Sequence, residues 1–472
     1  MPHKPTIEPR YNLAYVWSIC LVAALGGLLF GYDWVVIGGA KPFLERFFEL
    51  QTAAASGWAN SCALLGCLIG SLITGGLSDR FGRKRLLWSS ALLFAASSLL
   101  TGRAPTFNWF VAWRILGGVA IGMASNLSPM YIAEVAPAGI RGRLVAVNQL
   151  TIVIGILSAQ IVNWIIAVKL PHAGADAAVV ETVRQSWNTQ TGWRWMFSAV
   201  TVPSLLFFAG ALVIPESPRW LVKNGRPERA RRVLVRIGGE AYASTAVKDI
   251  ESTLAVDEIG HVRFKDLLES KVSKILLVGV TLAVLQQWSG INSIFNYAEE
   301  IYRSAGYGIG EILFNIVITG AINLVFTLFA IATVDRFGRR ILMLIGCAGI
   351  GLSHVLIGIA YALGMKGIHV LVFTLCALGC YGMSLAPVTW MLIAEIFPNR
   401  IRGAAVSVAV SALWIACFIL TFMFPILRDG IGMARTFWIY AIICFAGFAF
   451  VYFRVPETKG KTLEQIEKEV VG

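Results

Sequence analysis

The sequence contains few charged residues. Only 14% of its 472 residues are Asp, Glu, Lys or Arg, whereas about 25% is usual for a soluble globular chain. Hydrophobic residues make up 57% of the chain. A soluble protein of this composition would have more core than polar surface to cover it, and a disordered chain needs the opposite balance. The composition therefore excludes both classes and indicates a chain whose solvent is mostly lipid.

Several chemical groupings are also missing from the sequence. The eight cysteines lie in apolar stretches, where we expect small packing residues rather than disulfides. Cys376 and Cys380 share a helix face, but two thiols without a neighbouring His make a poor zinc site. Gly460-Lys461-Thr462 has no Gly at the upstream position that a P-loop requires. We therefore expect no metal, no cofactor, no ATP-driven pump and no enzyme.

Long apolar segments recur along the whole chain, and a helix needs about 20 mainly apolar residues to cross a bilayer. We expect the first six spans at 14–38, 57–77, 86–102, 107–133, 144–168 and 193–214. We expect the second six at 274–298, 311–334, 341–363, 368–393, 403–427 and 435–454. The sequence thus predicts an all-α membrane protein with 12 transmembrane helices.

The net charge of +13 is unevenly distributed. Most Lys and Arg residues fall on one side of the predicted spans, and loops with this excess face the cytoplasm. We therefore expect a multi-pass protein of the cell (inner or plasma) membrane with both termini cytoplasmic. Because topology accounts for the charge, we expect the lipid bilayer as a partner and no nucleic acid. No obligate protein partner is evident, so a monomer is the default.

Three loop motifs occur twice, in the same order. Asp79-Arg80-Phe81-Gly82-Arg83 is repeated as Asp335-Arg336-Phe337-Gly338-Arg339, and Pro215-Glu216-Ser217 as Pro456-Glu457-Thr458. The third pair begins at Glu134 and Glu395 and ends at Arg141-Gly142 and Arg402-Gly403. This repeat indicates two six-helix halves of parallel orientation, as in major facilitator transporters.

The repeat also sets the expected domains. We expect a first transmembrane half at 1–214, a cytoplasmic helical linker domain at 215–273, a second half at 274–454 and a cytoplasmic tail at 455–472. In the linker, Ser217-Pro218 is a favourable start for a helix. A helix ending at Gly238-Gly239 and another at 245–256 complete the predicted short bundle.

The repeated loops bring carboxylates and arginines to one surface. The Asp of each first motif can accept from backbone N–H groups at a helix start and face an Arg from a neighbouring loop. We hypothesise a latch that holds the cytoplasmic side shut between the halves. Its members are Asp79, Arg83, Glu134, Arg141, Asp335, Arg339, Glu395 and Arg402. The alternative is that the basic residues only set the topology.

Three motifs together resemble the sugar porter family of the major facilitator superfamily. They are PESPRWL at 215–221, the loop at 134–142 and Gln286-Gln287-x-x-Gly290-x-Asn292. The sequence resembles bacterial proton-coupled xylose and hexose symporters and, less closely, facilitative glucose carriers. The resemblance implies a secondary active importer of a monosaccharide, a pentose or a hexose, that works by alternating access. A facilitative uniporter, a proton-driven exporter and a non-transporting sugar sensor remain as alternatives.

Amides inside the predicted spans suit a sugar, because they are uncharged and both donate and accept. A single amide can equally bond a neighbouring helix. The resemblance implies sugar contacts for Gln149, Gln286, Gln287, Asn292, Asn323 and Trp390, with Phe30 and Trp414 at flanking aromatic positions. The sequence departs from the family pattern at Asn296, Ala386, Leu413 and Cys417. These departures predict a less polar C-terminal side of the pocket and leave the identity of the sugar open.

Two ionisable residues, Asp33 and Arg114, stand inside predicted spans. Each is costly alone in lipid, whereas a pair that faces the interior is tolerated. In the sugar porter family an Asp after the Gly-Tyr of the first span marks proton-coupled members, and Gly31-Tyr32-Asp33 matches this pattern. The resemblance therefore implies that the proton is the coupling ion, with a static ion pair as the alternative.

Overall fold

We describe a computed structural model of the chain over residues 11–167, 184–258, 270–397 and 402–459. The long elements of the first part are α1 (Leu13–Phe47), α2 (Ala53–Phe81), α3 (Arg83–Gly102), α4 (Phe107–Val135), α5 (Arg141–Ile166), α7 (Trp193–Ser198) and α8 (Thr201–Val213). Between them lie two short helical turns, η1 (Ala138–Ile140) and η2 (Asn188–Gly192). Two further helices, α9 (Pro218–Lys223) and α10 (Pro227–Glu258), follow.

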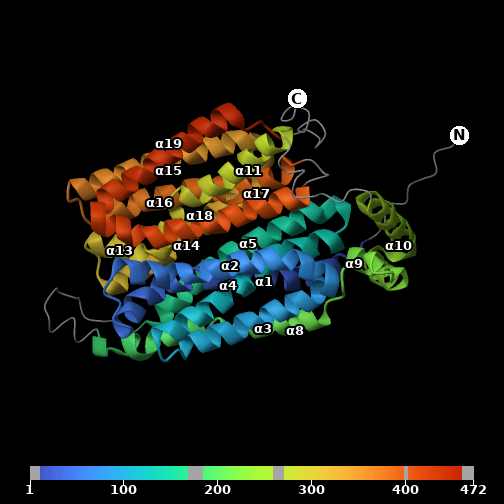
Figure 1. Cartoon of the computed structure of the whole chain (residues 1–472), viewed down its shortest axis with the longest axis horizontal. Helices are drawn as coiled ribbons and strands as arrows, with labels where there is room; N and C mark the ends of the chain where they lie inside the picture. Colours follow the sequence, from blue (N-terminus) through green and yellow to red (C-terminus); the bar gives the residue numbers. More distant parts are fainter. Residues whose placement is uncertain (1–10, 168–183, 259–269, 398–401, 460–472) are drawn as a thin grey trace.

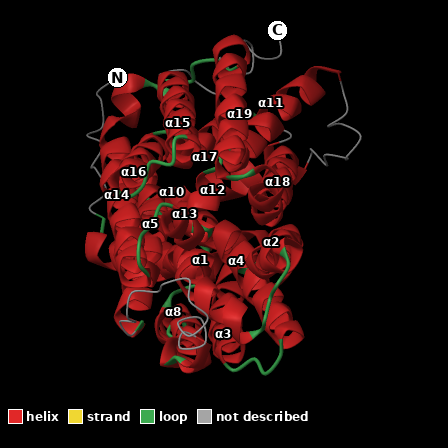
Figure 2. Ribbon diagram, turned by 90° about the vertical axis from the view of Figure 1, so that its left-hand side faces the viewer, coloured by secondary structure: helices red, strands yellow, loops and turns green. Residues whose placement is uncertain are grey.

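The second part continues with α11 (Ser270–Trp288), α12 (Ile291–Asn296), α13 (Ala298–Ser304), α14 (Ile309–Phe337) and α15 (Arg339–Ala362). It ends with α16 (Ile368–Met383), α17 (Leu385–Glu395), α18 (Arg402–Ile431) and α19 (Met433–Arg454). Figure 1 shows α1 to α8 gathered on one side of the bundle and α11 to α19 on the other, with α9 and α10 projecting at one end. Across the border, α2 packs against α18 and α5 packs against α14 (Figure 2).

Eleven helices in the described ranges are long and apolar enough to cross a membrane. The predicted span at 86–102 is found as α3, but this helix is not among the eleven. It begins with three basic residues, Arg83, Lys84 and Arg85, and contains several serines. Because α3 packs along α4 and α8, it is part of the same bundle. The total of twelve spans remains a prediction.

Two predicted spans break at a residue whose backbone is not helical. The segment at 274–298 divides at Gly290, which adopts a left-handed φ of 85° between α11 and α12. The segment at 368–393 divides at Ser384 between α16 and α17. Backbone groups freed by such breaks are tolerated at membrane depth only inside protein or along a cavity. The breaks therefore lie where a buried polar site can be built.

The predicted C-terminal end of the first span was wrong. We expected it to end at residue 38, but α1 continues through Lys41 and Pro42 to Phe47. The Lys41 side chain is fully buried and paired with carboxylates. Its charge is therefore neutralised inside the protein and does not end the helix.

The repeated loops are built differently from our expectation. Gly82 and Gly338, with φ of 91° and 89°, form the sharp corners before α3 and α15. The carboxylate of Glu216, rather than that of Asp79, accepts from the N–H groups of Arg83 at 2.9 Å and Lys84 at 3.1 Å. Burial raises the pKa of Glu216, and these N–H groups oppose the rise by stabilising the carboxylate. A carboxylate at a helix N-terminus is favoured by the dipole and the free N–H groups.

The second half repeats this construction. The Glu457 carboxylate accepts from the N–H groups of Arg339 at 2.9 Å and Arg340 at 3.1 Å. Glu216 and Glu457 occupy equivalent places in the repeated motifs. The internal repeat in the sequence is therefore matched by a repeated structural bond.

The region after α8 begins as expected. The Ser217 side chain accepts from the N–H of Trp220 at 3.3 Å, which caps α9. The chain bends inside α10 at Gly238 and Gly239, where helical φ and ψ are lost. Trp220 donates its indole N–H to the carbonyl of Asp79 at 2.8 Å, so α9 is fastened to the corner after α2.

Candidate functional site

The two ionisable residues of the predicted spans meet as an ion pair between α1 and α4. Arg114 donates from Nη1 to Oδ1 of Asp33 at 2.8 Å and from Nη2 to its backbone carbonyl at 3.3 Å. Each residue is only 3% exposed. Gly117, one turn from Arg114, lies beside the pair, because the place of a Cβ there is 3.5 Å from Oδ2 of Asp33. The structure therefore brings together the two residues singled out in the sequence.

Three of the predicted sugar contacts form a connected group, which we call the amide chain: Gln286, Gln287 and Asn292. Gln286 donates to the carbonyls of Leu385 at 3.1 Å and Ala386 at 3.3 Å, at the break before α17. Gln287 donates to Oε1 of Gln286 at 3.3 Å, and Asn292 donates to Oε1 of Gln287. The amide chain thus crosses the break at Gly290 and joins α11 and α12 to α17.

An aromatic trio adjoins this region, formed by Phe30, Trp34 and Trp414. The ring of Phe30 lies 6.2 Å from Trp34, and Trp414 lies 6.0 Å from both. Since Phe30 and Trp34 are on α1 and Trp414 is on α18, the trio bridges the two halves. Sequence reasoning missed Trp34, whose place one turn after Phe30 on the same helix was the available signal.

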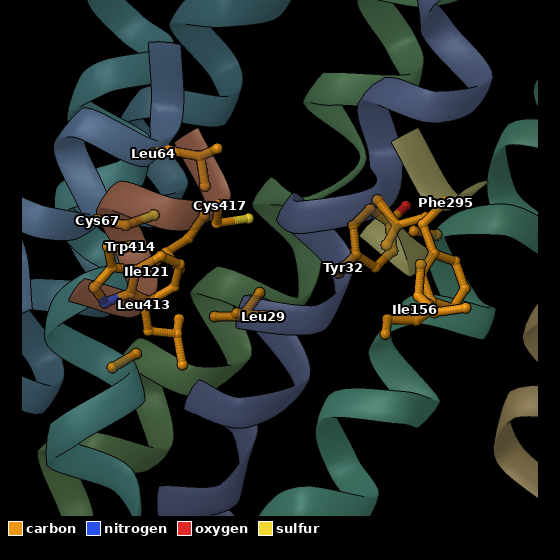
Figure 3. Close-up of a cluster of buried hydrophobic side chains, with 14 of the residues drawn as sticks. Leu29, Tyr32, Leu64, Cys67, Ile121, Ile156, Phe295, Leu413, Trp414 and Cys417 are labelled. Carbon is orange, nitrogen blue, oxygen red and sulfur yellow. The ribbon is translucent and has the colours of Figure 1, made fainter. Parts of the chain in front are cut away.

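The departures from the family pattern lie beside these groups. Asn292 of the amide chain also contacts the sulfur of Cys417 at 3.5 Å. Figure 3 shows Cys417, Leu413 and Trp414 of α18 clustered with Leu64, Cys67 and Ile121. The surroundings of Trp414 on this side are therefore apolar.

The remaining predicted sugar contacts are less closely connected. Asn323 is buried on α14, and its Oδ1 lies 3.0 Å from the place of a Cβ on Gly382. Gln149 on α5 and Trp390 on α17 are partly buried. Neither has a hydrogen bond to the amide chain in the described part of the protein. Their assignment as sugar contacts stays a prediction.

A second buried charge cluster, the Lys41 cluster, lies near the other end of α1 and consists of Lys41, Glu45, Glu300 and Arg428. Lys41 pairs with Glu300 of α13 and with Glu45 at 3.3 Å, and Arg428 of α18 pairs with Glu300. The Lys41 ammonium also lies 4.6 Å from the ring centre of Tyr297. The cluster joins the halves. Sequence reasoning missed it, although a Lys followed by Pro at the end of an apolar segment was visible.

Three of the predicted latch residues, Asp79, Arg83 and Glu134, form ion pairs in the described structure. Arg83 donates to Glu134 at 2.9 and 3.0 Å and to Asp79 at 3.3 Å, and Lys223 pairs with Asp79 at 2.9 Å. All these pairs lie on the α2 to α9 side, so they do not join the halves. Arg141 is exposed, and Arg339 is engaged through its backbone with Glu457.

The other latch residues cannot be assigned contacts. The side chains of Asp335, Glu395 and Arg402 lie outside the described residues. A latch between the halves therefore remains a hypothesis.

A two-part bundle of apolar helices, with uncharged amides at helix breaks and a buried ion pair between α1 and α4, defines a membrane transporter for a small polar solute. The sequence model of the family described as "Sugar (and other) transporter" matches residues 19–470. The chain belongs to this family, which confirms the resemblance drawn from the motifs.

Individual relatives match nearly the whole chain. The arabinose-proton symporter of Bacillus subtilis is 37% identical, with 99% of both chains covered. The D-xylose-proton symporter of Escherichia coli is 39% identical, with 98% of this chain and 97% of the relative covered. The structure of the xylose transporter XylE from E. coli, partially occluded and inward open, aligns with a TM-score of 0.82 at 36% identity. That alignment covers 95% of this chain and 100% of the other.

Proposed function

We propose that this protein imports a monosaccharide, a pentose or a hexose, together with protons by alternating access between its two halves. The observation that carries the proposal is the combination of three features inside the helix bundle. They are the amide chain, the aromatic trio and the buried pair of Asp33 and Arg114. Relatives named as arabinose and xylose symporters with protons support the same chemistry.

The amide chain and the aromatic trio suit a sugar. A sugar presents hydroxyl groups around its rim and C–H groups on its faces. Gln286, Gln287 and Asn292 offer donors and acceptors without charge, and the rings of Phe30 and Trp414 offer flat apolar surface. We assign Gln149, Asn323 and Trp390 to the same site on the family resemblance. Bound sugar would exchange some amide-to-amide bonds for bonds to hydroxyls.

Asp33 is suited to carry the proton. One carboxylate oxygen bonds Arg114, whereas Oδ2 is buried without a hydrogen-bond partner among the described residues. A carboxylate held in this way can take a proton on its free oxygen when the guanidinium is drawn aside. A change in the distance between α1 and α4 during alternation would then load and release the proton.

The Lys41 cluster supports the alternating-access part of the proposal. It closes one end of the interface between the halves through Lys41, Glu300 and Arg428. The described ion pairs at the opposite end, around Arg83, stay within one half. We infer that the cluster end is extracellular and closed, and that the end carrying α9 and α10 is cytoplasmic.

The finer topology belongs to the same proposal. We take α3 as the twelfth span and the chain as two transmembrane halves, 1–214 and 274–454, with a cytoplasmic linker at 215–273 and a tail at 455–472. Both termini are cytoplasmic, the membrane is the plasma membrane, and the protein works as a monomer without a cofactor.

Transport by the purified protein in liposomes tests the function. We expect labelled arabinose, xylose or glucose to accumulate when the outside is acidic, and sugar to cause proton uptake in a pH-recording assay. The Asp33→Asn protein should exchange sugar but not concentrate it. Sugar that only equilibrates in the wild-type protein would establish the uniporter, and accumulation by Asp33→Asn would refute the role of Asp33.

A further inference from the structure

A small cavity lies between α1, α2, α4 and α12, beside the ion pair. Its volume is about 10 Å³. Asn60, Arg114 and Asn296 form its polar lining, and Trp34, Leu64 and Ile121 contribute apolar surface. Figure 3 shows Leu64 and Ile121 in the cluster around Trp414, so the cavity borders the aromatic trio as well as the ion pair.

Each polar residue of the lining has one unsatisfied atom. These atoms are Oδ1 of Asn60, Nε of Arg114 and Oδ1 of Asn296, and none has a hydrogen-bond partner among the described residues. The three residues are 5%, 3% and 3% exposed. Two of these residues also use another group, since Asn60 donates to the Ser56 carbonyl at 3.0 Å and Arg114 donates to Asp33. The unsatisfied atoms of the lining residues are therefore one donor and two acceptors.

This set matches a single water molecule. A buried water needs about 10–15 Å³ of such space and two to four polar partners. A water here can accept from Nε of Arg114 and donate to the two amide oxygens, which satisfies all three atoms. We propose that the cavity binds one water, and that through it Asn60 and Asn296 position Arg114 against Asp33.

The position of Asn296 gives this water a role in coupling, a step that rests on the proposed sugar–proton symport. Asn296 is on α12, four residues after Asn292 of the amide chain, whereas Asn60 and Arg114 belong to the other half. The α12 backbone packs tightly on α1, because a Cβ on Gly38 would lie 2.5 Å from the carbonyl of Phe295. In Figure 3, Phe295 lies beside Tyr32 of α1 and Ile156 of α5.

Movement of α12 therefore changes the surroundings of the Asp33–Arg114 pair. When α12 leaves α1, Asn296 leaves the cavity, and Arg114 loses an ordered partner. A sugar held by Gln287 and Asn292 keeps α12 in place and so keeps the guanidinium aligned on Asp33. Asn60 and Asn296 thus act as positioning residues between the sugar and the proton.

In the described structure, the groups packed around Asp33 and Arg114 include no further charged side chain. The titratable neighbours of the pair are Tyr32 on α1 and the thiols of Cys62 and Cys67 on α2. The α7 helix contributes the ring of Phe197, 5.3 Å from the guanidinium. The α3 helix contributes the hydroxyl of Ser97, and α12 has no charged residue. A change in proton coupling after substitution at Asn60 or Asn296 would thus act through Arg114 and Asp33.

The test places Leu at each of the two amide positions and Ser at position 296. Asn60→Leu and Asn296→Leu keep a branch of similar shape and remove the polar atoms, whereas Asn296→Ser keeps a hydroxyl that can hold the water. Asn163→Leu is the matched control, because Asn163 is a buried amide on α5 that donates to the Val36 carbonyl at 2.9 Å, outside the cavity. Each protein is reconstituted in liposomes for sugar exchange at equal pH on both sides and for proton uptake per sugar.

We expect both Leu variants to exchange sugar but to take up fewer protons per sugar, because loss of a hydrogen bond to a charged group shifts the alignment of Arg114 on Asp33 by roughly tenfold. Their pH profile of exchange should differ from that of the wild type, and Asn296→Ser should restore it. If the Leu variants kept the proton uptake per sugar and the pH profile of the wild type, the inference would be refuted and the proposed function would stand. An equal change in Asn163→Leu would have the same consequence. Absence of sugar-induced proton uptake in the wild type would overturn the proposed function and the inference with it.

Discussion

Replacing Glu300 by Gln should weaken the closure of the two halves at the Lys41 cluster. Glu300 is 4% exposed and forms ion pairs with both Lys41, which is 0% exposed, and Arg428. Lys41 belongs to one half, and Glu300 and Arg428 belong to the other. The substitution keeps the shape of the side chain and removes the charge that holds Lys41 across the interface.

The size of the effect follows from the partners that remain. Removing one member of a buried pair costs about 3–5 kcal/mol, because the other charge stays buried. Here Lys41 keeps Glu45 at 3.3 Å on its own helix, and Arg428 keeps Asp429 at 2.7 Å. We therefore expect a smaller shift of about 2 kcal/mol, or roughly 30-fold in the equilibrium between closed and open forms.

Spin-label distances across this end of the molecule measure the shift. Gln51 and Arg303 line the same cavity of about 440 Å³ and belong to opposite halves. Labels at these positions, with the exposed Cys376 replaced by Ser, should report a longer distance in Glu300→Gln. Glu49→Gln is the control, because its pair with Arg184 is more than half exposed and worth about 0–1 kcal/mol. An unchanged distance distribution in Glu300→Gln would show that the cluster does not hold the closed form.

Three further outcomes follow from the geometry. Gly290→Ala should lower the melting temperature and transport, because φ of 85° and a Tyr440 ring 2.6 Å from the new Cβ cost about 1–3 kcal/mol or more. Gly76→Ala is the control and should leave the melting temperature unchanged, because a Cβ at Gly76 has nothing within 4 Å. Equal melting temperatures of the two variants would contradict this reasoning. Glu216→Gln should cost about 1–2 kcal/mol of stability by weakening the cap of α3, measured by thermal unfolding in detergent. Gln286→Ala should raise the KM for sugar about tenfold with less effect on kcat, and an unchanged KM would remove Gln286 from the site.

The sequence was most informative where a charged residue stands in an apolar segment, because burying a charge in lipid is unfavourable. Asp33 and Arg114 stood out because charges are rare in apolar spans, and the structure pairs them at 2.8 Å. Lys41 escaped the same reasoning because the predicted span ended before it. Its burial depends on Glu300, which is distant in the chain. A partner that far away leaves no local pattern.

The loop motifs were recognised, but the donor and acceptor roles within them were not. We assigned the helix-start N–H groups to Asp79, which precedes α3 closely in the sequence. The structure gives them to Glu216, 133 residues after Arg83. Likewise, the glycine at 290 was noted as part of a motif, but a glycine inside an apolar segment is compatible with a continuous helix. Only the left-handed φ, at a place where a Cβ would meet the Tyr440 ring, shows the break.

The segment that follows this break connects the features on which the proposed mechanism depends. Asn292 belongs to the amide chain, Asn296 lines the cavity beside Arg114, and Glu300 belongs to the Lys41 cluster. Between them, the Tyr297 hydroxyl donates to the Thr421 carbonyl of α18 at 2.6 Å. Because these residues are spaced four apart on two short helices, one displacement of α12 and α13 alters all three contacts together. Sugar binding, proton loading and closure at the Lys41 cluster are then coupled because the same two helices, α12 and α13, carry all three contacts.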